Sequence, residues 1–255
     1  MSRQRLGQHF LNKASILEGI ARAACPNREP LVIEIGPGHG ALTERLLERS
    51  QRVIAVEIDS GLVELLREKF RSEPRLTVHH ADALEMDFGH WGPAVVAGNL
   101  PYYVATPIIE RILALGPALY RGIFLVQKEV AARLVARAGS RDYGYLSIQT
   151  QLFADVERVF DVSPSAFRPP PKVDSTLIRL RPRDRAAELG IRNTAKFLVF
   201  VGMCFRQKRK TLRNNLAGVY GRDMLDTWPE AAKRAEQLTI EQIAELYLRV
   251  IRPRA

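Results

Sequence analysis

The segment EIGPGHGALT (34–43) carries glycines at alternate positions, a spacing that suits close contact between backbone and ligand. Gly36, Gly38 and Gly40 allow the chain to turn tightly and to approach a ligand ahead of a helix N-terminus. Glu57 follows Gly36 by 21 residues, where an acid binds ribose hydroxyls in dinucleotide sites. On these residues alone, an NAD site and a site for another nucleoside cofactor fit equally well.

Three further residues distinguish the two ligands. Pro37 removes a backbone donor that a pyrophosphate would use. Glu34 repels a pyrophosphate but suits a cationic cofactor. Asp82, in HHADAL, ends another apolar run and can accept a hydrogen bond from an adenine amine. Together these residues favour S-adenosylmethionine, with Glu57 on its ribose and Asp82 on its adenine. An NAD-dependent oxidoreductase remains the alternative enzyme.

The loop NLPY (99–102) follows the apolar run 94–98 and suits the binding of a planar amine. An aromatic amine is a poor nucleophile because its lone pair is delocalised into the ring. The side-chain oxygen of Asn99 and the carbonyl of Leu100 can accept its hydrogens, while Pro101 fixes the turn. Tyr102 offers a face on which a base can stack. Catalysis would then depend mainly on positioning.

Alternating β-rich and helical segments must position these residues. Such alternation predicts a parallel sheet with both faces covered, and ligands bind beyond the carboxyl ends of its strands. Thr106 and Pro107 predict the start of the helix after NLPY. The expected parallel strands are LVIEI (31–35), VIAVE (53–57), LTVHH (76–80), AVVAG (94–98) and GIFLV (122–126).

The later part of the chain changes character. The segments 156–162 and 174–180 are expected to pair as an antiparallel edge of the sheet. Beyond residue 183 only helical patterns occur, and Thr239 with Gln242 predicts a capping box. We therefore expect a first domain at 1–183 and a small helical domain at 184–255.

Composition points to a polyanionic partner. The formal net charge is +10, and FRQKRKTLRNNL (205–216) concentrates basic residues that we expect to contact RNA phosphates. Since such a run on a helix cannot all face one way, part of it is expected to be solvated. The basic residues of the run are Arg206, Lys208, Arg209, Lys210 and Arg213.

The sequence also lacks the features of a membrane or secreted protein. No apolar run approaches the roughly 20 residues of a membrane span, and no signal peptide is evident, which favours a cytoplasmic protein without membrane contact.

The two cysteines and the five histidines indicate no metal site. Cys25 and Cys204 lie far apart in apolar surroundings and are expected to be buried thiols. His79 and His80 lack partners at a metal-ligand spacing, so no metal is expected.

In their order along the chain, several segments resemble the KsgA family of ribosomal RNA adenine dimethyltransferases. The resemblance implies a Rossmann-like class I S-adenosylmethionine-dependent methyltransferase, with a seven-stranded, mostly parallel sheet and an all-helical C-terminal domain. It also implies transfer of methyls to two adjacent adenines near the 3′ end of small-subunit rRNA, within an assembling 30S particle; a monomer is the default. The segments are QHFL (8–11), EIGPGHGALT (34–43), Glu57, Asp82 with Ala83, NLPY (99–102), QKEVAARL (127–134), FRPPPKVDS (167–175) and FRQKRKTLRNNL (205–216).

The resemblance implies roles for individual residues. Asn99, Leu100, Pro101 and Tyr102 match the motif that binds the target adenine, and Phe167 matches an aromatic residue that closes over the flipped base. Phe167 fits a core position equally well. The residues that match cofactor contacts of the family are His9, Leu11, Gly36, Gly38, Glu57, Asp82, Ala83 and Asn99.

Two alternatives lie close to this interpretation. The Erm enzymes, which methylate large-subunit rRNA, share an N-x-P-Y loop, but Pro37, PPPKVDS (169–175) and RKTLRNNL (209–216) favour the KsgA type. An RNA-binding assembly factor without catalysis is opposed by the intact NLPY loop and acids. One departure concerns Tyr103, because the family commonly has Asn after NLPY.

Overall fold

The computed structural model describes residues 9–251 of the 255-residue chain. Gln8 of the QHFL segment lies outside that range, as do the N-terminal residues before it, to which the expected absence of a signal peptide refers. Packing divides the chain into two units, one containing residues 9–131 and 155–182, the other containing 132–154 and 183–251. Each unit has its own buried core.

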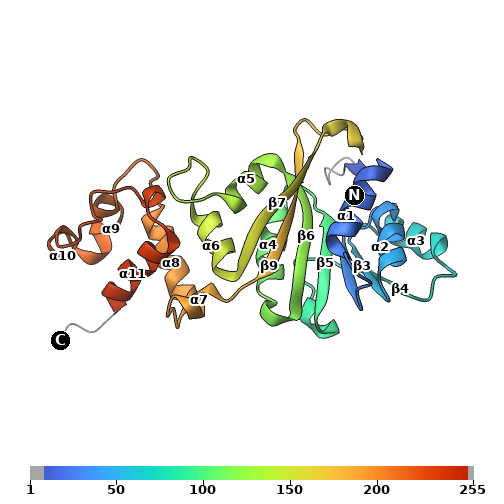
Figure 1. The fold of residues 1–255 in the computed structure, drawn as a ribbon, viewed down its shortest axis with the longest axis horizontal. Helices are drawn as coiled ribbons and strands as arrows, with labels where there is room; N and C mark the ends of the chain where they lie inside the picture. Colours follow the sequence, from blue (N-terminus) through green and yellow to red (C-terminus); the bar gives the residue numbers. More distant parts are fainter. Residues whose placement is uncertain (1–8, 252–255) are drawn as a thin grey trace. The chain divides into compact units, whose positions relative to one another are not determined.

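A seven-stranded sheet forms the first unit, in the order β4-β3-β2-β5-β6-β9-β7 (Figure 1). Its first five strands are parallel and β9 is antiparallel to β6, so the sheet is mostly parallel, as predicted. The expected edge pairing is also present, because β9 lies between β6 and β7. The strands are β2 (Val32–Ile35), β3 (Val53–Glu57), β4 (Leu76–His80), β5 (Ala94–Asn99), β6 (Leu119–Gln127), β7 (Ala154–Val162) and β9 (Ser175–Pro182).

Helices between the strands cover the sheet. β2, β3 and all of β5 except Asn99 are buried, as expected for central strands with packing on both faces. Cys25 and Cys204 are buried free thiols, which confirms that prediction. The helices that follow these strands or precede the first are α1 (Ala14–Ala24), α2 (Ala41–Arg49), α3 (Ser60–Lys69), α4 (Ala105–Leu113) and α5 (Lys128–Val135).

Helix α4 begins earlier than predicted. Its first residue is Ala105, and Val104 occupies the N-cap position without a side-chain hydrogen bond. The predicted N-cap, Thr106, therefore lies inside the first turn. The reason is local: the Val104 N–H donates to the Pro101 carbonyl (3.1 Å), so the turn set by Pro101 leads directly into the helix.

A short two-stranded sheet joins distant parts of the first unit. Strand β1 (Phe10–Leu11) pairs antiparallel with β8 (Phe167–Arg168), and the Asn12 N–H donates to the Ala166 carbonyl (3.0 Å). Because successive strand residues point to opposite faces, Leu11 enters the core while Phe10 faces the other way. This pairing fixes the N-terminal end of the described chain.

Helices and turns make up the second unit. Thr239 and Gln242 form the predicted capping box: the Thr239 N–H donates to Gln242 Oε1 (3.0 Å) and the Gln242 N–H to Thr239 Oγ1 (3.4 Å). No helix between residues 9 and 251 is long and apolar enough to cross a membrane. The helices are α6 (Tyr145–Phe153), α7 (Arg185–Glu188), α8 (Thr194–Cys204), α9 (Leu212–Tyr220), α10 (Arg222–Asp226) and α11 (Ile240–Ile251).

The two units differ from the predicted division at residue 183. Residues 132–154 precede that boundary in sequence but pack with the helical unit. Ile148 and Leu152 of α6 belong to the same buried cluster as Phe197 and Phe200 of α8. A strand-helix pattern does not reveal which core a helix joins, because that depends on contacts between distant residues.

Candidate functional site

The glycine-rich turn after β2 approaches the N-terminal strand closely. Gly36 and Gly38 have φ values of +69° and +57°, a region that side-chain-bearing residues rarely adopt. A Cβ on Gly38 would lie 3.0 Å from the ring of Phe10. That ring also contacts the ring of His39 edge-on, with centroids 4.3 Å apart. The glycine-rich turn and β1 therefore lie in contact with each other.

Glu57, at the end of β3, is held by three backbone N–H groups. Oε1 accepts from Ile58 (2.9 Å) and Asp59 (3.0 Å), and Oε2 accepts from Gly38 (3.2 Å). The side chain is nearly buried, and this burial raises the pKa of its carboxyl despite the three donors. A carboxylate fixed in this way is suited to accept hydrogen bonds from ribose hydroxyls.

Glu34 is the most deeply buried acid of the site. Burial raises the pKa of its carboxyl to about 8; the Thr43 hydroxyl, which donates to Oε2 (2.6 Å), acts in the opposite direction. The negative charge of Glu57 reinforces the rise. A cation brought into this site would favour the ionised form of Glu34.

The third acid lies beyond β4. Asp82 accepts a hydrogen bond from the Leu84 N–H (2.8 Å), which fixes its carboxylate at the end of the strand. Because β2, β3 and β4 are parallel and in register, Glu34, Glu57 and Asp82 meet at one edge of the sheet. The position of the sequence-predicted acids thus follows from the topology.

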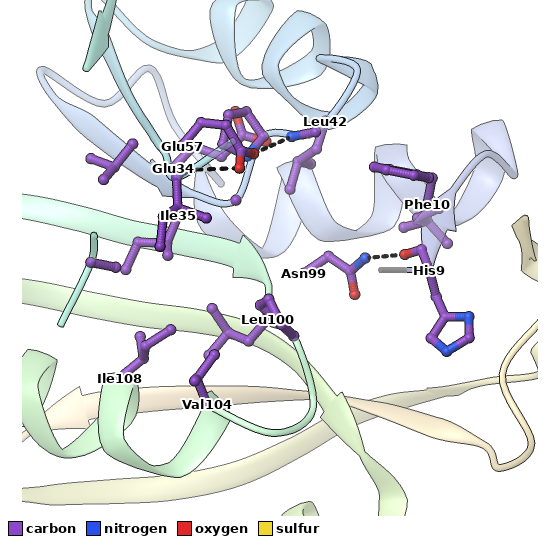
Figure 2. Close-up of a pocket in the computed structure, with 18 of the residues that line it drawn as sticks. His9, Phe10, Glu34, Ile35, Leu42, Glu57, Asn99, Leu100, Val104 and Ile108 are labelled. Atoms are coloured by element: carbon purple, nitrogen blue, oxygen red, sulfur yellow. Dashed lines mark hydrogen bonds between the residues drawn. The ribbon is translucent and has the colours of Figure 1, made fainter. Parts of the chain in front are cut away.

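Asn99 is oriented by the N-terminal strand. Its Nδ2 donates to the His9 carbonyl (2.9 Å), so its side-chain oxygen points away from His9 (Figure 2). The next residue, Leu100, is buried, and its N–H donates to the Leu125 carbonyl (3.2 Å). These contacts fix the start of the NLPY loop and leave the Asn99 oxygen oriented as an acceptor.

Tyr102 is held by contacts to its hydroxyl and to its ring. Its hydroxyl lies 2.9 Å from the Ser175 Oγ of β9, and its ring centroid lies 5.6 Å from that of His9. Burial raises the pKa of the Tyr102 phenol, so the group stays neutral. The imidazole Nδ1 of His9 lies 2.8 Å from the Pro169 carbonyl. The aromatic face beside Asn99 therefore has a defined position.

One cavity of about 360 Å³ joins these groups. The glycine-rich turn, the strand-end acids and the NLPY loop all line it, together with His9, Leu11 and Ala83. Sequence reasoning missed Phe10 and Ser175, one of which lines the cavity while the other positions Tyr102. Both belong to segments that carry the family resemblance. Strand alternation alone would place Phe10 on the face opposite His9 and Leu11, so it does not predict that all three line the cavity.

Phe167 stands apart from the other predicted residues. It is 2% exposed, packs in the core of the first unit, and pairs with Leu11 across the β1–β8 sheet. It is not among the residues that line the cavity. In this structure Phe167 occupies the core position that the sequence also allowed.

The basic run lies mainly in a loop rather than on a helix. Residues 205–211 connect α8 to α9, and the side chains of Arg206, Lys208, Arg209 and Lys210 are exposed. Because they lie in a loop, the directions of these side chains are not set by the roughly 3.6-residue period of a helix. Only Arg213 stands on α9, where its Nη2 donates to Asp226 Oδ2 (2.6 Å).

A second hollow of about 570 Å³ adjoins this loop within the helical unit. Lys208 and Arg209 line it together with Arg141 and Arg234, two basic residues that sequence reasoning did not select. The Lys208 ammonium donates to the Arg141 carbonyl, and Glu236 also lines the hollow. Isolated arginines far apart in sequence carry no local signal, so only the fold brings them to the basic loop.

The sequence profile of the ribosomal RNA adenine dimethylase family matches residues 1–251. The chain belongs to this family. A ribosomal RNA small subunit methyltransferase A of Legionella pneumophila is 40% identical over 246 residues, which cover 96% of each chain. The cavity geometry and the family therefore agree on an S-adenosylmethionine-dependent methyltransferase.

Two solved structures resemble this fold. A dimethyladenosine transferase from Plasmodium falciparum is 28% identical and has a TM-score of 0.81, with 94% of this chain and 97% of that chain covered. The 23S rRNA methyltransferase ErmE is 27% identical and has a TM-score of 0.71, with 92% and 98% covered. The Legionella enzyme is more similar in sequence than either, which favours the small-subunit type over the Erm type.

Proposed function

We propose that this protein transfers methyl groups from S-adenosylmethionine to the N6 atoms of two adjacent adenines near the 3′ end of small-subunit rRNA. The observation that carries the proposal is the oriented carboxamide of Asn99, whose oxygen is available as an acceptor beside a cavity lined by three strand-end acids. Family membership supports the same reaction.

The cavity suits the cofactor. Glu57 would hold the ribose hydroxyls, Asp82 with Ala83 the adenine, and the positive-φ glycines would bring the backbone close to the methionine part. Burial raises the pKa of Glu34 to about 8, and a bound cationic centre would favour its ionised form. The resulting charge would stabilise that centre more strongly in this buried setting than in water. The cofactor supplies a methyl group on a positively charged sulfur.

Asn99 and Leu100 would position the target amine. The Asn99 oxygen and the Leu100 carbonyl accept its two hydrogens, which draws the nitrogen lone pair toward the cavity. After methyl transfer the amine carries an acidic proton, which passes to water or to a nearby acceptor. No strong base is required, and alignment can supply roughly 7 to 11 kcal/mol.

Tyr102 would provide the stacking surface for the target base. Its ring is held by Ser175 at the hydroxyl and lies beside His9, so little conformational freedom remains to be lost on binding. An adenine must leave its helix to reach this cavity, as in other enzymes that modify bases.

The exposed cations of the 205–211 loop would contact the phosphates of the rRNA. Arg141 and Arg234 extend the same cationic surface. We further propose that the substrate is an assembling small-subunit particle in the cytoplasm and that the enzyme acts as a monomer. Phe167, buried in the core of the first unit and paired with Leu11 of β1, would hold β1 in place rather than contact the base.

The decisive experiment is mass spectrometry of small-subunit rRNA from cells with and without the gene. Loss of dimethyladenosine in the deletion strain, and its return on complementation with the wild-type chain, are expected. Complementation with the Asn99→Ala variant should fail although the protein accumulates. Retention of dimethyladenosine in the deletion strain would contradict the proposal.

A further inference from the structure

Two consecutive tyrosines face different environments: Tyr102 ends the NLPY loop, and Tyr103 follows it directly. Tyr102 is half-buried and hydrogen-bonded to Ser175, whereas Tyr103 is 61% exposed. Both line the same cavity. Among residues 9–251, no hydrogen bond or aromatic contact involves the Tyr103 side chain. One tyrosine is therefore fixed inside the site, and the other presents its ring to solvent at the edge.

The backbone that carries Tyr103 is held on both sides. Before it, Leu100 is buried and bonded to the Leu125 carbonyl. After it, Val104 donates to the Pro101 carbonyl, and α4 starts at Ala105. Only the side-chain torsions of Tyr103 remain to be ordered by a ligand, so stacking on this ring carries a small entropic cost.

We propose that Tyr103 stacks on the base of the nucleotide adjacent to the one whose amine Asn99 holds, and thereby favours RNA with two neighbouring purines. This inference rests on the proposed function and names a specificity-determining residue for it. An exposed aromatic ring beside a base-binding loop provides the kind of flat surface that unpaired bases use.

The contrast between the tyrosines supports this assignment. When one base enters the cavity toward Asn99, its neighbour on the strand stays near the cavity edge, because consecutive nucleotides are covalently joined. Tyr103 is the most exposed of the tyrosine, phenylalanine and tryptophan side chains among residues 9–251, and it lines that cavity. A ring that merely completed the core would be buried, as Phe88 and Phe124 are.

The test measures methylation of small-subunit particles that lack dimethyladenosine. One set carries both adjacent adenines, and the other has one of them replaced by uracil. Tyr103→Ala should raise KM for the first set at least about fivefold while kcat stays within about twofold, since stacking contributes to binding rather than to chemistry. The second set should respond less, because uracil stacks more weakly. Tyr103→Phe, which keeps the ring, should retain the difference between the two sets.

Tyr120→Ala serves as the control variant. Tyr120 is also an exposed tyrosine, but it lies near the start of β6, away from the cavity lining. Its removal should leave both KM values unchanged. S-adenosylmethionine affinity, measured by calorimetry, should be equal for Tyr103→Ala and the wild type.

Four outcomes would overturn the inference. Equal KM changes on both sets, or no change on either, would mean that Tyr103 does not contact the neighbouring base. Loss of cofactor affinity would mean that the ring closes over the cofactor instead. If the wild type methylated neither set, the proposed function itself would fail, and the inference with it.

Discussion

The cavity of the first unit and the basic loop of the second use charge in opposite ways. In the cavity, Glu34 and Glu57 are 1% and 3% exposed, and each is held by specific donors. In the loop, Lys210 and its basic neighbours are exposed to solvent. The acids lose their hydration when the protein folds rather than when a ligand binds, so their side chains are already in position before a ligand arrives. The cations keep their hydration until RNA binds.

The difference leads to distinct expectations for single substitutions. A buried, oriented group cannot be replaced by a neighbour, so its loss should have a large and specific effect. Each exposed cation contributes one of several phosphate contacts, so its loss should have a small effect that depends on salt.

Asn99→Ala should produce the largest effect. Removing one oriented polar group from an enzyme site typically lowers kcat by about 10²- to 10³-fold, and Asn99 has no duplicate in the NLPY loop. Cofactor affinity should fall far less, because Glu57 and Asp82 remain. Steady-state methylation assays and calorimetry measure the two effects separately. Asn27→Ala, at an exposed asparagine, is the matched control. Equal losses of affinity and kcat would show that Asn99 acts mainly on the cofactor.

Glu34→Gln should change the pH dependence of stability. The pKa of Glu34 is raised from 4.5 to about 8 in the folded protein, so the folded state holds a proton that the unfolded chain releases. The free energy of unfolding of the wild type should therefore fall as pH rises from 4.5 to 8, by up to about 1.4 kcal/mol per pH unit. The glutamine variant lacks this loss and should be relatively most stable near pH 8 and above.

Urea unfolding of the unliganded protein across this pH range measures the difference. Glu64→Gln is the control, since Glu64 is an exposed glutamate on α3. Its curve should follow that of the wild type. If the Glu34→Gln curve also ran parallel to the wild type, Glu34 would be ionised in the empty cavity, and the contrast between a costly buried acid and exposed cations would weaken.

Replacing Arg206, Lys208 and Lys210 together by alanine should weaken RNA binding in a salt-dependent way. Each lost phosphate contact reduces the magnitude of the slope of log K against log salt by about 0.7 to 0.9. Binding to small-subunit rRNA fragments at several salt concentrations measures this slope. The control replaces three exposed cations of the first unit, Arg28, Arg52 and Arg71, and removes the same net charge. Equal slopes for the two triple variants would mean that the loop cations contribute only to the overall charge of the protein and make no specific phosphate contacts.

Sequence reasoning predicted the cavity better than it predicted the basic loop. The acids could be placed because parallel strands bring their carboxyl ends to one edge, so Glu57 and Asp82 needed only correct strand assignments. The orientation of Asn99 could not be predicted, because its Nδ2 donates to a backbone carbonyl 90 residues away in the sequence. The burial of Phe167 likewise depends on the pairing of β8 with β1.

The basic run shows the opposite limit. Its composition pointed to phosphates, but its conformation as a loop depends on where α8 ends at Cys204 and where Thr211 caps α9. Thr211 accepts a hydrogen bond from the Asn214 N–H (3.4 Å), so the helix starts after most of the cations have passed. Threonine is a favoured N-cap residue, so the start of α9 after Thr211 could have been predicted from the sequence. The contribution of Arg141 to the same surface could not, since it comes from a separate segment.

Replacing Arg213 should have the smallest effect on RNA binding among these substitutions, and it tests whether a paired cation differs from an unpaired one. Unlike Arg206 and Lys210 of the loop, it is paired with Asp226 (Nη2 to Oδ2, 2.6 Å), so its charge is already balanced before RNA binds. Arg213→Ala should therefore leave the salt slope nearly unchanged and lower affinity by less than Arg206→Ala or Lys210→Ala does. Asp226→Asn removes the partner, and it should strengthen RNA binding and steepen the slope by up to one phosphate contact, because Arg213 then releases counterions as the loop cations do. An unaltered slope in Asp226→Asn would place Arg213 outside the RNA surface.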